Sequence, residues 1–137
     1  MTLDPRTFTV KTSEAVAAAM QAAASTGHNE LTSHHVLSEL VKQNDTMVLP
    51  LLAKVGVPVA QIVDKCTTVL GKLPTVKGNP EPRLTRELAA AFAAAGELQV
   101  EFRDEYLSVE VLAVSMHDIV GVPRDEMVAA LREVRGS

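Results

Sequence analysis

A short motif that occurs twice constrains the fold of this chain more than any other feature of its sequence. The tetrapeptide Val-Gly-Val-Pro stands at residues 55–58 and again, letter for letter, at residues 120–123. Upstream, Leu-Thr at residues 31–32 is matched by Leu-Ser at residues 107–108. Self-similarity of this kind is the signature of a duplicated structural unit.

The start of each copy is also similar. Thr-Ser-Glu at residues 12–14 matches Thr-Arg-Glu at residues 85–87, and an alanine-rich run follows both. The two Val-Gly-Val-Pro turns lie closer together than the upstream Leu-Thr and Leu-Ser segments do, which predicts that the second copy has lost a short third helix before its turn. Each copy is too small to bury its own apolar face, so we expect one all-α, pseudo-duplicated helical bundle with a shortened second repeat.

In the first copy, hydroxyl residues, prolines and glycines predict four helices. One begins at residues 12–14 and ends before Gly27, and a second begins at residues 32–33 and fades at residues 43–44. Asp45 is expected to cap a short third helix that ends at Gly56. A fourth begins at Pro58 and ends at Gly71, with an apolar stripe that includes Cys66.

Residues 74–82 contain three prolines and a glycine, which predicts a connector without regular structure. After it, Thr85, Ser108 and Pro123 are expected to begin the three helices of the second copy. We therefore expect a single domain over residues 1–137, with repeat one at 8–73, the connector at 74–82 and repeat two at 83–135.

Composition excludes several other classes. Aromatic residues are only 3% of the 137 residues, which argues against an all-β fold, while 47% apolar and 22% charged residues are typical of a folded domain. A net charge of −4 argues against nucleic acid as a partner. The single cysteine, the absence of a long apolar run and a start unlike a secretory signal favour the cytoplasm, with no membrane partner.

Few residues suggest catalysis or metal binding. His28, His34 and His35 lie close in sequence, but their spacing matches no recognised metal site, so helix caps or surface histidines are favoured. Cys66 lies on an apolar stripe and is expected to be a core thiol. No phosphate-binding loop or nucleophile motif is present, so we expect a domain that is not an enzyme and holds no metal or cofactor of its own.

An acidic cluster at residues 103–110 is a candidate binding site. It places Asp104 and Glu110 around a predicted helix start, between the apolar residues Leu98 and Val111. Acidic groups near a helix N-terminus are common because they complement the helix dipole, so two interpretations stay open: a dipole complement or the polar rim of a peptide groove.

Five segments together resemble a known family, the duplicated N-terminal domain of the Clp-type AAA+ chaperones, and most closely the ClpB-type disaggregases. They are residues 8–15, 27–32, 70–74, 104–110 and 131–136. The resemblance implies a compact all-helical module, tethered to ATPase modules that bind ATP, which recruits unfolded or aggregated polypeptides through an apolar groove with a polar border. It implies a monomeric isolated domain, a hexameric full-length protein, and a chaperone or protease adaptor as a further partner.

Carried over residue by residue, the resemblance assigns substrate binding to six positions. The polar ones are Thr9, Asp104 and Glu110, and the apolar ones are Phe92, Leu98 and Val111. The related ClpC-type unfoldases read phosphorylated arginine with a glutamate in each copy, whereas this chain has such a glutamate only in the second, at Glu110.

Two other functions stay open at this point. One is a stand-alone adaptor or regulatory domain that docks a folded protein partner. The other is a small helical enzyme, for which the sequence offers no convergent polar pocket.

Overall fold

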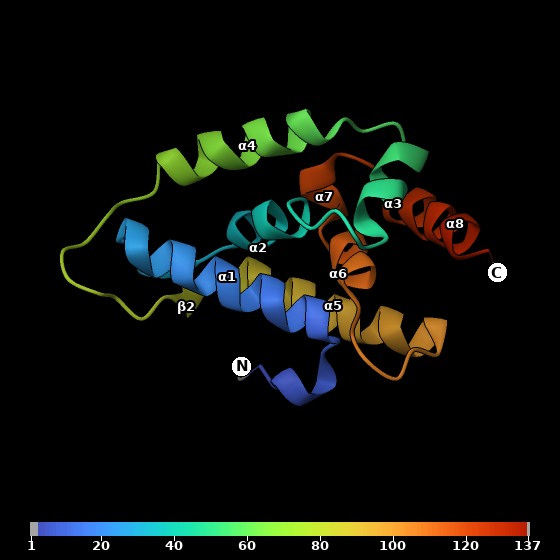
Figure 1. Cartoon of the computed structure of the whole chain (residues 1–137), viewed down its shortest axis with the longest axis horizontal. Helices are drawn as coiled ribbons and strands as arrows, with labels where there is room; N and C mark the ends of the chain where they lie inside the picture. The colour runs from blue at the N-terminus through green and yellow to red at the C-terminus, as the bar shows by residue number, and fades with distance from the viewer. Residues whose placement is uncertain (1–2, 137) are drawn as a thin grey trace.

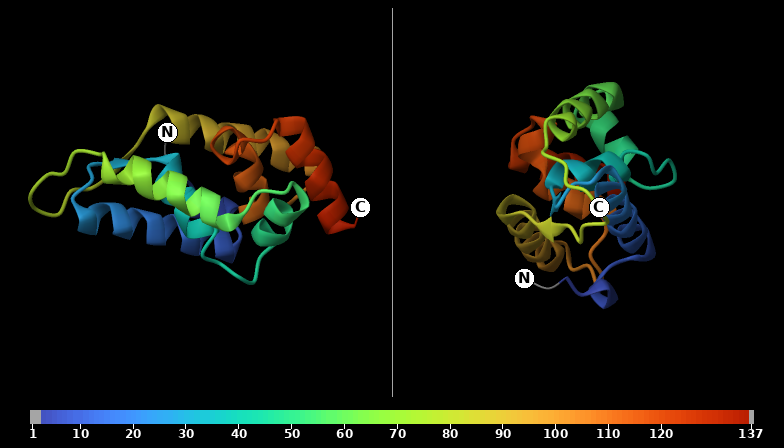
Figure 2. Two further views of the ribbon diagram at one scale, coloured as in Figure 1. Left: turned by 90° about the horizontal axis from the view of Figure 1, so that it is seen from above. Right: turned by 90° about the vertical axis from the view of Figure 1, so that its left-hand side faces the viewer.

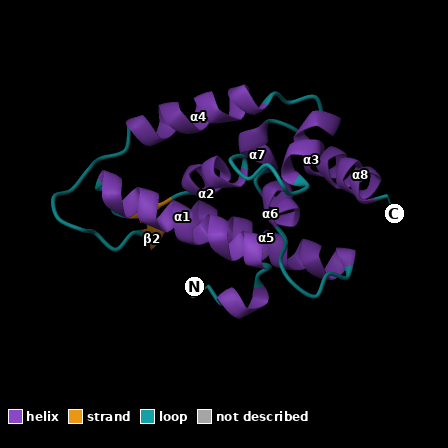
Figure 3. Ribbon diagram, in the orientation of Figure 1, coloured by secondary structure: helices purple, strands orange, loops and turns teal. Residues whose placement is uncertain are grey.

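A computed structural model describes residues 3–136 of the chain. After a short 3-10 helix, η1 (Pro5–Thr7), the first half contains four helices and one two-residue strand. These are α1 (Val10–Thr26), β1 (Glu30–Leu31), α2 (Ser33–Leu40), α3 (Val48–Lys54) and α4 (Val59–Gly71). The second half contains β2 (Arg83–Leu84), α5 (Arg86–Phe102), α6 (Val109–Ser115), α7 (His117–Val120) and α8 (Arg124–Arg135). Helices dominate the structure, which confirms the predicted all-α class (Figure 3).

The second helix of each copy lies at the centre of the bundle. α2 packs against both α1 and α4, while α6 packs against α5, α3 and α8, and the two central helices contact each other (Figures 1 and 2). All six residues from Val109 to Val114 of α6 are buried. Alanines at every fourth position of α1, Ala15, Ala19 and Ala23, are buried as well, and their small side chains let neighbouring helices approach closely. None of the helices described here has the length and apolar content needed to cross a membrane.

Two short parallel backbone pairings join the copies and reveal their symmetry. Leu31, at the entry to α2, pairs with Leu84 at the entry to α5. Phe8, at the entry to α1, pairs with Leu107 at the entry to α6. Each of these four residues stands directly before a helix cap, so Phe8 corresponds to Leu84 and Leu31 to Leu107. One pairing is therefore the other with the two copies exchanged.

That correspondence corrects the predicted start of the first helix. The cap of α1 is Thr9, whose hydroxyl accepts a hydrogen bond from the Thr12 amide, and α1 and α5 have equal lengths of 17 residues. Thr9 is therefore the counterpart of Thr85, and the match of residues 12–14 to 85–87 was displaced by almost one helical turn. Thr12 instead lies inside the helix, where its buried hydroxyl donates to the Leu107 carbonyl at 2.8 Å.

The third helix of the second copy is shortened rather than lost. α7 is a single turn of four residues, in the same position before the Val-Gly-Val-Pro turn that α3 has in the first copy. Most of the deletion falls in the loop, because residues 41–47 separate α2 from α3 whereas only Met116 separates α6 from α7.

Asp45 does not cap α3, contrary to the prediction. The Thr46 hydroxyl accepts from the Val48 amide instead, at 3.2 Å. The Asp45 carboxylate pairs with the Lys11 ammonium at 2.7 Å, and this hydrogen bond holds the pKa of Asp45 below its usual value. Asp45 therefore pairs with Lys11 of α1 instead of capping α3.

Residues 74–82 contain no helix or strand, and they are tied to the end of α1. The Val76 amide donates to the Gly27 carbonyl at 2.7 Å. Gly27 has a φ of +84°, and a Cβ placed on it would lie 2.8 Å from the Val76 carbonyl oxygen. Glycine is thus required here by both backbone conformation and space.

Candidate functional site

The predicted acidic cluster is a compact ion-pair network whose cation comes from the far end of the chain. Arg135, in the last turn of α8, donates to Asp104 through both terminal nitrogens, with Nη1–Oδ1 at 3.0 Å and Nη2–Oδ2 at 2.9 Å. It also donates to Glu110 Oε2 from Nη2 at 2.9 Å and from Nε at 3.3 Å. A weaker contact joins Nη2 to Ser108 Oγ at 3.3 Å. One guanidinium therefore bridges two carboxylates and a hydroxyl.

Local structure places each of the acceptors. Arg103 ends α5 in the left-handed conformation, with φ of 60°, and the following loop carries Asp104. Gln99 holds that loop by donating to the carbonyls of Asp104 and Glu105 at 3.2 and 3.1 Å. Ser108 caps α6, and Glu110 lies in the first turn of the same helix.

The network is largely removed from water. The side chains of Arg135, Asp104 and Glu110 are 17%, 20% and 12% exposed. Burial lowers the pKa of Arg135, but hydrogen bonds and attraction from the two carboxylates outweigh it, so the pKa lies above the usual value. The guanidinium also lies 5.1 Å from the centre of the Phe102 ring, in cation–π range.

A hollow of about 430 Å³ lies beside this network. Its lining comes from three separate segments and consists of Thr9, Lys11, Asp45, Thr46, Met47, Ser108, Val109 and Glu110. Two of the predicted site residues, Thr9 and Glu110, are thus brought together, and Asp104 is linked to them through Arg135. We call this the polar hollow.

The three predicted apolar residues are not on the surface. Phe92, Leu98 and Val111 are 6%, 2% and 0% exposed. Phe92 stacks on Phe8, which directly precedes Thr9 in the chain, with ring centres 5.7 Å apart. All three belong to the core, and a direct binding role for them stays a prediction.

Three apolar residues outside the predicted set are exposed on the segments that form or adjoin the polar hollow, and one of them, Met47, lines it. Val10, Met47 and Tyr106 are 73%, 38% and 47% exposed. Val10 directly follows Thr9, and Tyr106 directly precedes Leu107. The Thr9 amide donates to the Leu107 carbonyl at 3.0 Å, so the two exposed residues lie on adjacent segments. The repeat pattern could have indicated the first of these, because Val10 is an apolar residue at a helix start whose counterpart in the second copy is an arginine.

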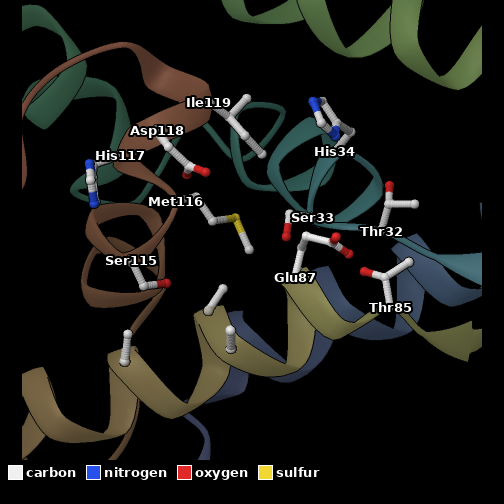
Figure 4. A pocket seen from close by; sticks show the side chains of 13 residues that line it. Thr32, Ser33, His34, Thr85, Glu87, Ser115, Met116, His117, Asp118 and Ile119 are labelled. Atoms are coloured by element: carbon white, nitrogen blue, oxygen red, sulfur yellow. The ribbon is translucent and has the colours of Figure 1, made fainter.

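A second and larger hollow lies between α2, α5 and α7, with a volume of about 630 Å³ (Figure 4). Its apolar members include Ala90, Ala94, Met116 and Ile119. In Figure 4, Met116 lies between Glu87 from α5 and His34 from α2; it is only 1% exposed, so it forms part of the wall of this hollow. We call it the apolar hollow; no sequence pattern indicated it, because its walls include small alanines brought together by packing.

Two of the three candidate histidines, His28 and His35, form a buried pair. His28 Nδ1 and His35 Nε2 are 2.9 Å apart, and both residues are buried. His35 also takes part in the cap of α2, because its Nδ1 accepts from the Thr32 amide at 3.0 Å. In residues 3–136 no three histidine, cysteine or acidic side chains gather as they would around a metal. Cys66 is buried, and burial raises the pKa of its thiol to about 11, as expected of a core thiol.

The geometry defines a class of protein: a duplicated, all-α repeat domain. Two equivalent backbone pairings join its copies, and hollows remain between its helices. The chain belongs to the family described as the Clp repeat (R) N-terminal domain, which matches residues 7–120. This confirms the resemblance that the motifs indicated.

Individual relatives agree with this assignment. The chain is 39% identical over 109 residues to the chaperone protein ClpB of Mycobacterium tuberculosis (strain ATCC 25618 / H37Rv); the match covers 79% of this chain and 13% of that relative. The fold is similar to the Hsp104 N-terminal domain from Candida albicans, with a TM-score of 0.78, 18% identity, and coverage of 95% of this chain and 92% of that one. It is also similar to the ClpV N-domain in complex with a VipB peptide, with a TM-score of 0.79, 16% identity, and coverage of 98% and 96%.

Proposed function

We propose that this domain is a binding module that captures exposed apolar segments of unfolded or aggregated polypeptides, without catalysis of its own. The observation that carries the proposal is the polar hollow, which Thr9 and Glu110 both line, with Val10, Met47 and Tyr106 exposed on the segments that form or adjoin it. Family membership supports it, because the sequence relatives are named chaperones. In a longer protein, the domain raises the local concentration of polypeptide at an ATP-driven pore without adding contacts there.

In this proposal the six predicted site residues have different tasks. Thr9, Asp104 and Glu110 form the polar border, while Phe92, Leu98 and Val111 hold that border in place from the core. The Val111 amide donates to Ser108 Oγ at 3.2 Å, and Ser108 itself lines the polar hollow. The apolar contacts with polypeptide come from the exposed Val10, Met47 and Tyr106.

A second candidate function is the docking of a protein partner in the apolar hollow. The size of that hollow favours it, and a related ClpV N-domain has been solved with a VipB peptide. The two candidates use different surfaces, so one experiment distinguishes them.

The experiment is an NMR titration of the domain with a permanently unfolded protein, using two matched surface variants. Met47→Glu places a charge at the polar hollow, and Ala94→Glu places the same charge in the apolar hollow; both residues are exposed, so both variants are expected to fold. We expect shifts at Thr9, Met47 and Glu110 that Met47→Glu abolishes and Ala94→Glu leaves unchanged. Shifts confined to the surroundings of Ala94 would mean that polypeptide binds in the apolar hollow instead. A folded domain with no shifts contradicts polypeptide capture and favours the docking of a folded partner.

A further inference from the structure

The guanidinium of Arg135 is bound as a separate arginine ligand would be. It meets two carboxylates, a hydroxyl and the face of an aromatic ring, which together satisfy its charge, its planar donors and its apolar surface. The groups around Arg135 thus form a complete site for a basic side chain.

This site is continuous with the polar hollow. Ser108 and Glu110 both contact Arg135, and both line the hollow. If the Arg135 side chain moves away, Glu110 in the wall of the hollow and Asp104 behind it no longer have a cation between them. Unpaired carboxylates in a partly buried place are costly, so the opened site favours any cation that a bound segment brings.

The last turn of α8 can release Arg135 without exposing the core. The buried residues of α8 are Met127, Ala130 and Leu131, so none lies in residues 132–135. Gly136 then ends the helix with φ of 76°. Helix ends open at a fraction of the free energy needed for global unfolding. Besides Arg135, the turn is held by an ion pair between Glu133 and Lys54 at 2.7 Å, with both side chains at least half exposed.

We propose that Arg135 is a built-in competitor that occupies the acidic end of the polar hollow, and that polypeptide segments with an arginine or lysine beside an apolar residue displace it. This inference rests on the proposed function and adds to it a substrate class and a means of regulation. Segments without a basic residue bind only to the apolar part of the hollow. Any contact that keeps the last turn of α8 folded weakens the capture of basic segments.

The test compares two short apolar peptides that differ only in one arginine, replaced by glutamine in the second. We measure their affinities for the wild-type chain, for Arg135→Gln and for the control Arg132→Gln. Arg132 is exposed and lies 4.5 Å from the centre of the same Phe102 ring, but it has no bond to Asp104 or Glu110. Because the apparent Kd rises when the binding-competent state is only partly populated, Arg135→Gln is expected to bind the arginine peptide about 3- to 10-fold tighter. Arg132→Gln is expected to equal the wild type.

A second measurement needs no variant and so does not depend on the fold of Arg135→Gln. The Nε–H signal of Arg135 is followed by NMR while the wild-type chain is saturated with the arginine peptide; we expect it to shift and to lose its protection from exchange with water. The proposal that Arg135 is a competitor is overturned if its signal does not move at saturation. It is also overturned if the wild type and Arg135→Gln bind the arginine peptide with equal affinity. Binding of the glutamine peptide at the polar hollow would then leave the proposed function intact. If neither peptide binds any of the chains, the proposed function fails and the competitor fails with it.

Discussion

Acidification is expected to destabilise the domain through His35. This side chain is only 4% exposed, and both of its ring nitrogens have partners. The Thr32 amide donates to Nδ1, so Nδ1 carries no proton, and Nε2–H donates to His28 Nδ1. A second proton on His35 would break the cap of α2 and place a charge in the core.

These surroundings set the sign of the effect. Burial, followed by the nearby His28 and His34, lowers the pKa of His35 from 6.5 to about 4. The unfolded chain therefore binds a proton more readily than the folded one. The full stability is present above the unfolded pKa of 6.5, falls as the pH drops, and levels off below the folded pKa near 4.

The magnitude follows from the same two pKa values. Each unit of difference corresponds to about 1.4 kcal/mol, so the full effect is about 3 kcal/mol. Between about pH 7 and pH 5 the expected loss in the free energy of unfolding is about 2 kcal/mol. His34, whose pKa is also lowered by burial, acts in the same direction, so a variant is needed to isolate His35.

The assay is urea unfolding of the wild type and His35→Asn at several pH values between about 7 and 4.5. His34→Asn serves as the control that keeps the buried pair. We expect the wild type to lose about 2 kcal/mol more than His35→Asn between about pH 7 and 5. The control lacks the contribution of His34 but is expected to keep most of the loss that His35 causes. Parallel loss in the wild type and His35→Asn, or an NMR titration of His35 centred near 6.5 in the folded chain, would refute the reasoning.

Three further predictions concern packing and backbone. Gly27→Ala is expected to lower the free energy of unfolding, measured in urea, by about 2 to 4 kcal/mol, because the new methyl group meets the Val76 carbonyl. The control Gly56→Ala, with a φ of +74° but nothing within 4 Å, is expected to lower it by only about 1 kcal/mol. Equal losses would contradict the steric argument. Cys66 is expected to react with a thiol reagent at about pH 8 only after urea is added, because the residue is 1% exposed and burial raises the pKa of its thiol to about 11. Rapid reaction in the folded state would show that α4 opens. Leu98→Ala is expected to lower the free energy of unfolding by about 2 to 5 kcal/mol, and a cost below about 1 kcal/mol would mean that Leu98 is not a core residue.

Local signals in the sequence were sufficient for most of the helices. Thr85 and Ser108 cap their helices as predicted, and Gly27 and Gly56 stand after the helices they were expected to end. These signals work because a capping hydroxyl and an amide two or three residues later are close in the chain whatever the rest of the molecule does.

The errors arose where a distant partner decided the outcome. Thr9 rather than Thr12 caps α1, since the Thr9 amide and the Thr12 hydroxyl both bond to the Leu107 carbonyl from the other copy. Asp45 was drawn from its expected capping role by Lys11. In each case the local sequence offered more than one hydroxyl or carboxylate as a cap, and a contact between segments far apart in sequence engages the residue that was predicted to be the cap.

The candidate site shows the same division. Asp104 and Glu110 could be recognised together because they stand close in sequence, on either side of one helix start. Their cation, Arg135, comes from another helix, and no periodicity or motif connects it to them. The burial of Phe92, Leu98 and Val111 likewise depends on which helix faces α5 and α6 meet.

By itself, then, the sequence determined that this chain is a duplicated bundle of helices, because duplication, caps and apolar periodicity all act over a few residues. Only the tertiary structure decided which apolar faces are covered, which small hollows remain, and that the acidic pair is neutralised from within by Arg135. Those outcomes depend on Coulombic and packing contacts between segments brought together by the fold, whose energies appear only once the two copies have docked.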